Sequence, residues 1–141
     1  MKVLFDCNVL LDVGVNRQPW FPESAAALQC AEEFVIQGYV AWHSIATIDY
    51  VANLRAATDA RPFITELVEV LRVPSVGQRD IELALRMPMT DLEDAMQVAA
   101  AVACGADRIV TRNTKHFKAS IVPAVTPAEL LAELGGEKGS K

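Results

Sequence analysis

The sequence predicts an α/β fold: a three-layer α/β/α sandwich built around a central, mostly parallel sheet. Short apolar runs of strand length alternate along the chain with segments of helical periodicity, which is the order of elements in such sheets. The chain has 141 residues, enough for one domain with a substantial core. Its composition is 52% hydrophobic and 22% charged, which is typical of a compact globular protein rather than a disordered one.

In the first half of the chain, strands are short apolar runs and helices show apolar residues at three- and four-residue spacing. The second predicted helix has Glu23 in its first turn and Gly38 just beyond its end, both common helix-end signals. In order, the patterns predict a strand at residues 2–5, a helix beginning near Asn8, a helix from about Pro22 to Gln37, a strand at residues 39–42, a helix capped by Ser44 that runs to about residue 57, and a helix from Pro62 to Leu71.

The second half continues the alternation, and the domain is expected to cover residues 1–134, followed by a flexible glycine-containing tail at 135–141. Thr126 caps the last helix, with Pro127 at its first position. The predicted elements are a short strand at 72–76, a helix from Arg79 to Arg86, an alanine-rich helix opened by Thr90 and ended by Gly105, a strand at 107–111, a weaker strand at 121–125 and a helix from Pro127 to Leu134.

Charge and cysteine content exclude several classes of protein. The net charge is −5, so any contact with nucleic acid requires a local basic patch, for which Arg108, Arg112, Lys115 and Lys118 are candidates. Taken singly, each is better explained as ordinary surface charge. No apolar stretch approaches the roughly 18 residues of a membrane span. The three cysteines are odd in number and lack metal-ligand spacing, which predicts reduced thiols in a cytoplasmic protein.

Polar side chains follow three of the predicted strands. They are Asp6 and Asn8 after the first strand, His43 and Ser44 after the second, with Asp49 about one turn into the next helix, and Thr111 and Asn113 after the third. In open parallel sheets, ligands bind beyond the carboxyl ends of the strands. We therefore expect these side chains to surround a common site.

The alanine-rich helix adds three acids at its start. Thr90 and Glu93 fit a capping box, and Asp91 is a first-turn acid that complements the helix dipole. Asp94 instead shares a helix face with the apolar residue Val98, so its carboxylate needs either backbone amides or a cation as a partner. Both explanations of Asp94 are open at this level.

The same choice applies to Asp6, which is either the cap of the helix beginning near Asn8 or a metal ligand. Carboxylates that converge at strand ends repel one another unless a divalent cation neutralises them, and oxygen ligands suit Mg²⁺ or Mn²⁺. A zinc site is not expected, because His43 and His116 are the only histidines and the cysteines are scattered.

Three segments, VLFDCNVLLD at residues 3–12, DLEDAMQVAAAVACGADRIVTRNTKHF at 91–117 and VPAVTPAELL at 122–131, resemble PIN-domain proteins, most closely the VapC-type toxin ribonucleases of bacterial toxin–antitoxin pairs. The resemblance runs in order from Met1 to about Leu134. It implies an α/β/α fold, cleavage of RNA phosphodiester bonds that depends on Mg²⁺ or Mn²⁺, homodimerisation, and an antitoxin partner whose C-terminal segment covers the site.

The resemblance also implies roles for individual residues. Asp6 and Asp94 match the metal-binding acids, and Asn8 matches the polar companion of Asp6. Asp49 falls where many relatives carry Glu, and Asn113 where many carry Asp, with Thr111 two residues earlier. The implied catalytic set is therefore Asp6, Asp94, Asp49 and Asn113, supported by Asn8, Asp91 and Thr111, with Arg112 and Lys115 on the RNA backbone.

Three departures from the family pattern keep a second hypothesis open. Asp49 is shorter than Glu, Asn113 carries no charge, and His116 stands where an acid is often found. The alternative is a PIN-like domain that has lost activity and serves as a binding module. Trp20, Phe21 and Trp42 are candidates for stacking on bases, but core or surface packing is the better explanation of each.

Overall fold

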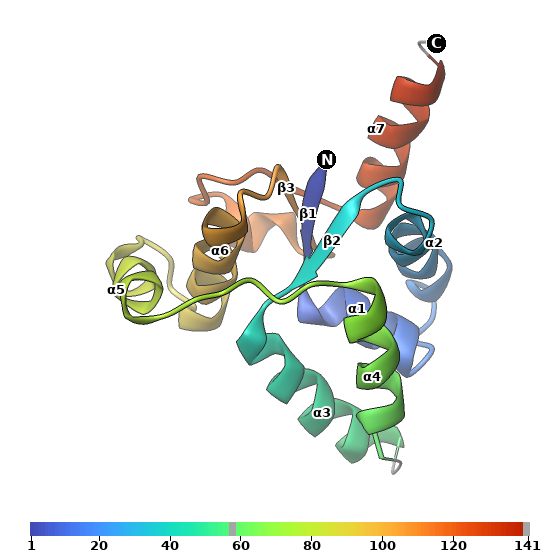
Figure 1. The fold of residues 1–141 in the computed structure, drawn as a ribbon, viewed down its shortest axis with the longest axis horizontal. Helices are drawn as coiled ribbons and strands as arrows, with labels where there is room; N and C mark the ends of the chain where they lie inside the picture. The colour runs from blue at the N-terminus through green and yellow to red at the C-terminus, as the bar shows by residue number, and fades with distance from the viewer. Residues whose placement is uncertain (57–58, 140–141) are drawn as a thin grey trace.

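Four short parallel strands form the centre of the protein, in the order β2-β1-β3-β4 (Figure 1). The computed structural model describes residues 1–56 and 59–139. Strand β1 (Lys2–Phe5) pairs with β2 (Gln37–Val40) and with β3 (Arg108–Val110), and β3 pairs with β4 (Ala124–Val125). All four carboxyl ends therefore meet at one edge of the sheet, which we call the carboxyl edge. The predicted α/β class is confirmed.

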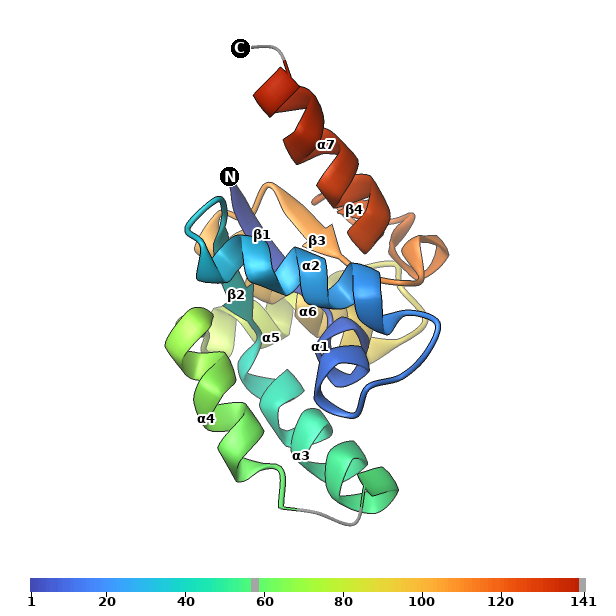
Figure 2. The ribbon, with the colours of Figure 1, turned by 90° about the vertical axis from the view of Figure 1, so that its right-hand side faces the viewer.

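Helices cover both faces of the sheet because the central strand is apolar on both sides. Val3 and Phe5 point into one core, whereas Leu4 points into the other. The first core is closed by α2 (Phe21–Glu32) and α7 (Pro127–Gly139), and the second by α6 (Leu92–Cys104), with α5 (Gln78–Arg86) packed behind it (Figures 1 and 2).

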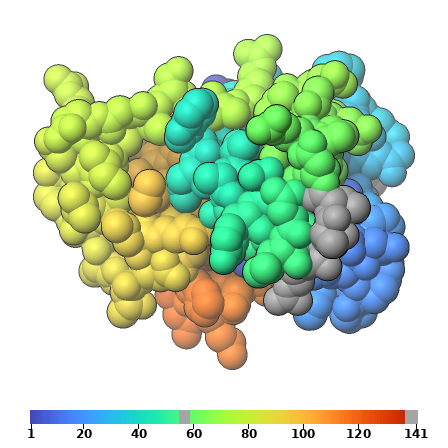
Figure 3. All heavy atoms as spheres, turned by 90° about the horizontal axis from the view of Figure 1, so that it is seen from below, coloured from blue at the N-terminus to red at the C-terminus, as the bar shows by residue number. Residues whose placement is uncertain are grey.

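The remaining helices lie at and beyond the carboxyl edge. Helix α1 (Cys7–Gly14) follows β1 directly, α3 (Trp42–Ala56) follows β2, and the short 3₁₀ helix η1 (Thr114–Phe117) follows β3. Helix α4 (Arg61–Val70) returns beside α3. Figure 3 looks onto this edge, with α3 in the middle and α5 and α6 to one side. No helix in the described part of the chain is long and apolar enough to cross a membrane.

The second predicted helix ends earlier than its sequence indicates, and Gly38 has a different role. Helix α2 stops at Glu32, and Phe34, with a φ of 60°, makes the left-handed turn that glycine usually makes. Gly38 lies inside β2, paired with Val3. A Cβ at this position would stand 2.4 Å from Leu71 Cδ2, so the bare backbone makes room for that side chain.

Other boundaries differ as well. Helix α3 begins at Trp42 rather than at Ser44, and of the strand predicted at 72–76 only an isolated bridge between Arg72 and Tyr39 forms. The last helix continues through Gly139, so the segment 135–139 of the predicted tail is helical. Glycines lower helix propensity without forbidding a helix. Residues 140 and 141 lie outside the described part of the chain.

Replacing Gly38 by valine is expected to lower the free energy of unfolding by about 1–3 kcal/mol, because the new side chain overlaps Leu71 and its neighbours. Gly136→Val is the matched control, since a Cβ there meets no atom within 4 Å. Urea denaturation of both variants measures the difference. Equal stabilities for the two variants would contradict the assigned packing role of Gly38.

Candidate functional site

The buried carboxylate of Asp6 lies at the centre of the carboxyl edge. Its Oδ2 accepts a hydrogen bond of 2.9 Å from the Thr111 hydroxyl, and its Oδ1 accepts one of 3.3 Å from Gln97 Nε2. Gln97 also donates to the Ser44 hydroxyl at 2.9 Å. The Asp6 side chain makes no capping bond to α1, although the residue occupies the N-cap position. It therefore joins the end of β3 to the faces of α6 and α3.

Gln97 was not among the residues assigned from the sequence. It is fully buried, and its Oε1 has no hydrogen-bond partner among the described residues. Because Gln97 follows Asp94 by three positions, both lie on one face of α6. That spacing is visible in the sequence, but an uncharged glutamine within an alanine-rich helix gives no signal of its own.

Asp91 alone caps α6, so the capping box predicted for Thr90 and Glu93 is wrong. Helix α6 begins at Leu92, and Asp91 Oδ1 accepts hydrogen bonds from the amides of Glu93 at 2.8 Å and Asp94 at 3.4 Å. This later start releases the Glu93 side chain, whose Oε1 instead accepts a 3.5 Å hydrogen bond from the Cys7 thiol. Glu93 thus stands beside Asp6, the neighbour of Cys7.

Asp6, Asp91, Glu93 and Asp94 make up what we call the acidic cluster, in which neighbouring negative charges help to raise the pKa of Asp6 and of Asp94. Burial raises the pKa of Asp94 to about 6, with further increases from Asp91, Asp6 and Glu93, while His116 acts in the opposite direction. Burial also raises the pKa of Asp6, with a smaller contribution from Glu93, against the hydrogen bond from Thr111. This crowding of like charge calls for a positive partner.

Among the described residues, the one group in ion-pair distance of Asp94 is His116, whose Nδ1 lies 3.8 Å from Asp94 Oδ2 and whose side chain is 59% exposed. One exposed imidazole at this distance offsets at most one of the four acidic charges of the cluster. Within the described part of the chain, the closely spaced carboxylates thus outnumber the protein cations paired with them, which is the charge pattern of a divalent metal site.

The donor set fits Mg²⁺ or Mn²⁺. In the described part of the chain, no three His, Cys, Asp or Glu side chains already stand in the arrangement of a metal shell. Mg²⁺ needs fewer protein ligands than that, because it usually keeps several waters and binds one or two carboxylates plus substrate phosphate. Asp6 and Asp94 supply two such carboxylates, with Glu93 beside them.

The other polar residues predicted for the site lie at different distances from the acidic cluster. The backbone amide of Asn113 donates to the Thr111 hydroxyl at 3.1 Å. The exposed Asn113 therefore lies one hydrogen bond from the hydroxyl group that holds Asp6. Asn8 is exposed at the start of α1, where its Oδ1 accepts a 3.4 Å hydrogen bond from Arg17.

The structure does not bring Asp49 to the acidic cluster. Its side chain lines the groove between α3 and α4 together with Ile45 and Arg61. On an ideal helix, five residues separate Asp49 from Ser44 by about 140°, so the two point in different directions. The shorter reach of Asp compared with Glu adds to this separation.

Arg112, predicted to contact RNA, instead forms an ion pair with a buried carboxylate. Asp12 is fully buried, and its oxygens lie 2.9 Å from Arg112 Nε and 3.0 Å from Arg17 Nε. The Arg112 guanidinium also lies over the Trp20 ring, 3.9 Å from its centroid. Trp20 therefore packs on a cation, and Arg112 holds the loop after β3 against α1.

The other members of the predicted basic patch are divided between two regions. Arg108 lies at the start of β3, away from the carboxyl edge, and pairs with Glu133 at 3.3 Å. Lys115 and Lys118 are exposed in and just after η1, on the segment that carries His116. These two lysines remain as exposed cations beside the acidic cluster.

An acidic site at the carboxyl edge of a parallel sheet defines this chain as an α/β protein with a candidate metal centre. The family model of the PIN domain matches residues 2–115. The chain therefore belongs to the PIN domain family. No curated protein matches the sequence.

Several solved structures share the fold. A toxin–antitoxin complex from Klebsiella pneumoniae is 25% identical, with a TM-score of 0.67 over 89% of this chain and 97% of that one. A FitAcB structure from Neisseria gonorrhoeae is 16% identical, with a TM-score of 0.64 over 89% and 98%. VapBC-1 from nontypeable Haemophilus influenzae is 13% identical, with a TM-score of 0.62 over 91% and 99%.

Asp94→Asn is expected to stabilise the metal-free protein at pH 7. The ordinary carboxyl pKa is 3.8 and that of folded Asp94 is about 6. The folded protein thus holds this proton more tightly, and the contribution of Asp94 to stability falls as pH rises through that window. Removing the ionised group should raise the free energy of unfolding at pH 7 by on the order of 1–3 kcal/mol.

The measurement is urea denaturation in a chelating buffer at pH 7 and at pH 4, where the gain should largely disappear. Glu66→Gln, on the exposed surface of α4, removes the same charge away from the acidic cluster and should change stability little. A less stable Asp94→Asn protein at pH 7 would show that the carboxylate is satisfied without metal.

Asp12→Asn is expected to lower the free energy of unfolding by about 3 kcal/mol, because two partly buried arginines lose a fully buried counter-charge. Arg108→Gln breaks the more exposed pair with Glu133 and should cost less than about 1 kcal/mol. Thermal and urea unfolding of both variants tests the contrast, and equal losses would rule out a central structural role for Asp12.

Proposed function

We propose that this protein is a metal-dependent ribonuclease, the toxin of a toxin–antitoxin pair, which hydrolyses RNA phosphodiester bonds with Mg²⁺ or Mn²⁺. The observation that carries the proposal is the acidic cluster: Asp6 and Asp94 lie close enough at the carboxyl edge for their charges to interact, and burial together with neighbouring acids raises the pKa of each. Membership of the PIN domain family supports the same conclusion.

Asp6 and Asp94 would hold the ion, which when bound stabilises negative charge on the phosphate and acidifies a water molecule. Thr111 and Gln97 orient the Asp6 carboxylate, since each donates to a different oxygen. The Cys7 thiol holds Glu93 beside Asp6. We assign to Glu93, in place of Asp49, the role of receiving the proton of the attacking water.

In this reaction the water oxygen forms a bond to phosphorus as the bond to the leaving ribose oxygen breaks. One proton passes from the water to the Glu93 carboxylate, and the leaving oxygen takes up a proton from solvent. Lys115 and Lys118 are the exposed cations nearest to His116 in sequence, and they suit contacts with the RNA backbone despite the acidic total charge.

The proposed partner is an antitoxin protein that covers the site. The supporting observation is that several structures similar to this chain are toxin–antitoxin complexes, among them the one from Klebsiella pneumoniae at 25% identity. Homodimerisation and a cytoplasmic location remain predictions from the sequence.

Cleavage of single-stranded RNA should require Mg²⁺ or Mn²⁺ and should fall by about a hundredfold or more in Asp6→Asn and in Asp94→Asn, since each loses a charged metal ligand. Asp49→Asn is the control, because Asp49 faces the groove between α3 and α4 and should retain nearly full activity. A labelled RNA, followed over time with and without chelator, measures all four proteins.

Undiminished cleavage by both the Asp6 and the Asp94 variant would contradict the proposed site. A comparable loss in Asp49→Asn would show that Asp49 reaches the reaction after all. If the wild type cleaves nothing, titration calorimetry with Mn²⁺ decides the next step: without Asp94-dependent binding, the inactive binding module is the better description.

A further inference from the structure

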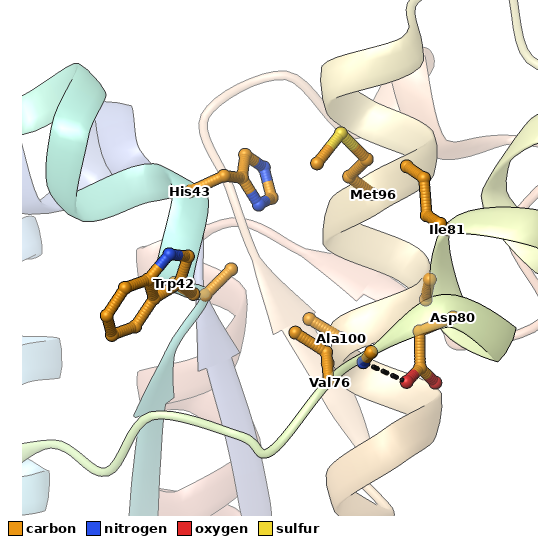
Figure 4. Close-up of a pocket in the computed structure, with 10 residues that line it drawn as sticks. Trp42, His43, Val76, Asp80, Ile81, Met96 and Ala100 are labelled. Atoms are coloured by element: carbon orange, nitrogen blue, oxygen red, sulfur yellow. Dashed lines mark hydrogen bonds between the residues drawn. The ribbon is translucent and has the colours of Figure 1, made fainter.

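A pocket of about 110 Å³ opens beside the acidic cluster, between the start of α3 and the packed pair α5 and α6 (Figure 4). His43 comes from the start of α3, Val76 and Asp80 from the loop before α5 and its first turn, and Met96 and Ala100 from α6. Three separate segments of the chain thus build its walls, and none of these residues holds Asp6.

The pocket lies on α3 and α6, the two helices that carry Ser44 and Gln97 next to Asp6. His43 directly precedes Ser44, and Met96 directly precedes Gln97, the pair joined by a 2.9 Å hydrogen bond next to Asp6. The charges of Glu93 and Asp6 also act on His43. A group bound in the pocket would therefore lie directly next to a phosphate held at the acidic cluster.

The walls are largely apolar, with a polar group at each end. His43 Nε2 is buried and has no hydrogen-bond partner among the described residues. In Figure 4 the imidazole ring points toward Met96, across the mouth of the pocket from Asp80. Burial lowers the pKa of His43 and so favours the neutral ring, whereas the charge of Glu93 acts in the opposite direction.

Asp80 supplies an acceptor at the other end. Its Oδ2 accepts a 2.8 Å hydrogen bond from the Gly77 amide, and its second oxygen makes no hydrogen bond within the described part of the chain. The carboxylate is thus fixed in place with one oxygen left for a ligand. A group with an N–H to donate would satisfy it.

These features select a flat, neutral ring with polar edges. Asp80 lines the pocket and repels negative charge, so an anionic ligand inside the pocket is disfavoured. An unpaired RNA base has apolar faces for contact with Val76 and Met96 and has hydrogen-bonding edges for the two polar ends. Among bases, those with an exocyclic amino group can donate to Asp80, whereas the corresponding group of uracil is an acceptor.

We propose that this pocket binds one unpaired nucleobase of the RNA, with its exocyclic amino group toward Asp80 and its opposite edge toward His43. The proposal rests on the ribonuclease function proposed above and names how such an enzyme would choose where to cut. A base seated here would set the position of the adjoining phosphate at the acidic cluster.

Binding can be measured without cleavage. In protein carrying ¹³C-methyl methionine, the Met96 methyl group reports on the pocket, and the other three methionines, Met1, Met87 and Met89, serve as internal references. Cytidine should shift the Met96 resonance, and uridine should bind roughly three- to tenfold more weakly, because its O4, which replaces the amino group of cytosine, is an acceptor that faces the Asp80 carboxylate. Asp80→Asn should remove this preference, since an amide both donates and accepts.

Two matched valine variants test the location. Val76→Trp should fill the pocket and abolish the cytidine shift, whereas Val68→Trp, in the groove between α3 and α4, should leave it unchanged. Val76 is 44% exposed and Val68 47%, so neither substitution disturbs the core. Circular dichroism and the melting temperature verify folding of each protein.

The proposal fails if no nucleoside moves Met96 at millimolar concentration, if Asp80→Asn keeps the cytidine preference, or if the two tryptophan variants behave alike. Its failure is distinguishable from failure of the ribonuclease function. RNA cleavage without a Met96 response overturns only the base pocket. A Met96 response in a wild type that cleaves no RNA, retained in Asp6→Asn, supports the pocket and counts against the nuclease.

Discussion

The arrangement of the carboxyl edge depends on the hydrogen bonds made by one buried carboxylate, that of Asp6. Thr111 and Gln97 each donate to one of its oxygens, and Gln97 continues to Ser44. These contacts join the end of β1 to the end of β3, to α6 and to α3. A buried carboxylate without donors is costly, so the helices and strands that bring donors to Asp6 also fix the position of the site.

A second constraint is that the negative charges of the acidic cluster lower the stability of the folded protein. Burial and the neighbouring acids raise the pKa of Asp94 to about 6, so its ionised form at neutral pH is destabilised. The carboxylates of the acidic cluster repel one another, and a bound divalent cation would relieve that repulsion. Asp12, in the second half of α1, shows the opposite arrangement, because two arginines pair with its buried carboxylate. These two ion pairs hold the loop after β3 against α1.

The structure also separates cations that look equivalent in the sequence. Arg108, Arg112, Lys115 and Lys118 fall within a short stretch, yet Arg108 and Arg112 are each held by an acid, whereas the two lysines are exposed. The acids at the start of α6 also have different roles. Asp91 caps the helix, Glu93 accepts a hydrogen bond from Cys7, and Asp94 interacts with the charge of Asp6. Their roles depend on where α6 begins, and a shift of one or two residues is beyond sequence patterns.

The amino-acid pattern by itself determined the α/β class, the parallel strands and the placement of Asp6 and Asp94 at strand and helix ends. These features depend on local periodicity and on the rule that parallel strands end at one edge. Only the tertiary structure decided that Gln97 holds Asp6, that Asp49 turns toward α4, that Arg112 is paired with Asp12, and that a pocket forms beside His43. Each of these depends on contacts between residues far apart in the chain, and side-chain direction across such contacts is set by packing rather than by local sequence.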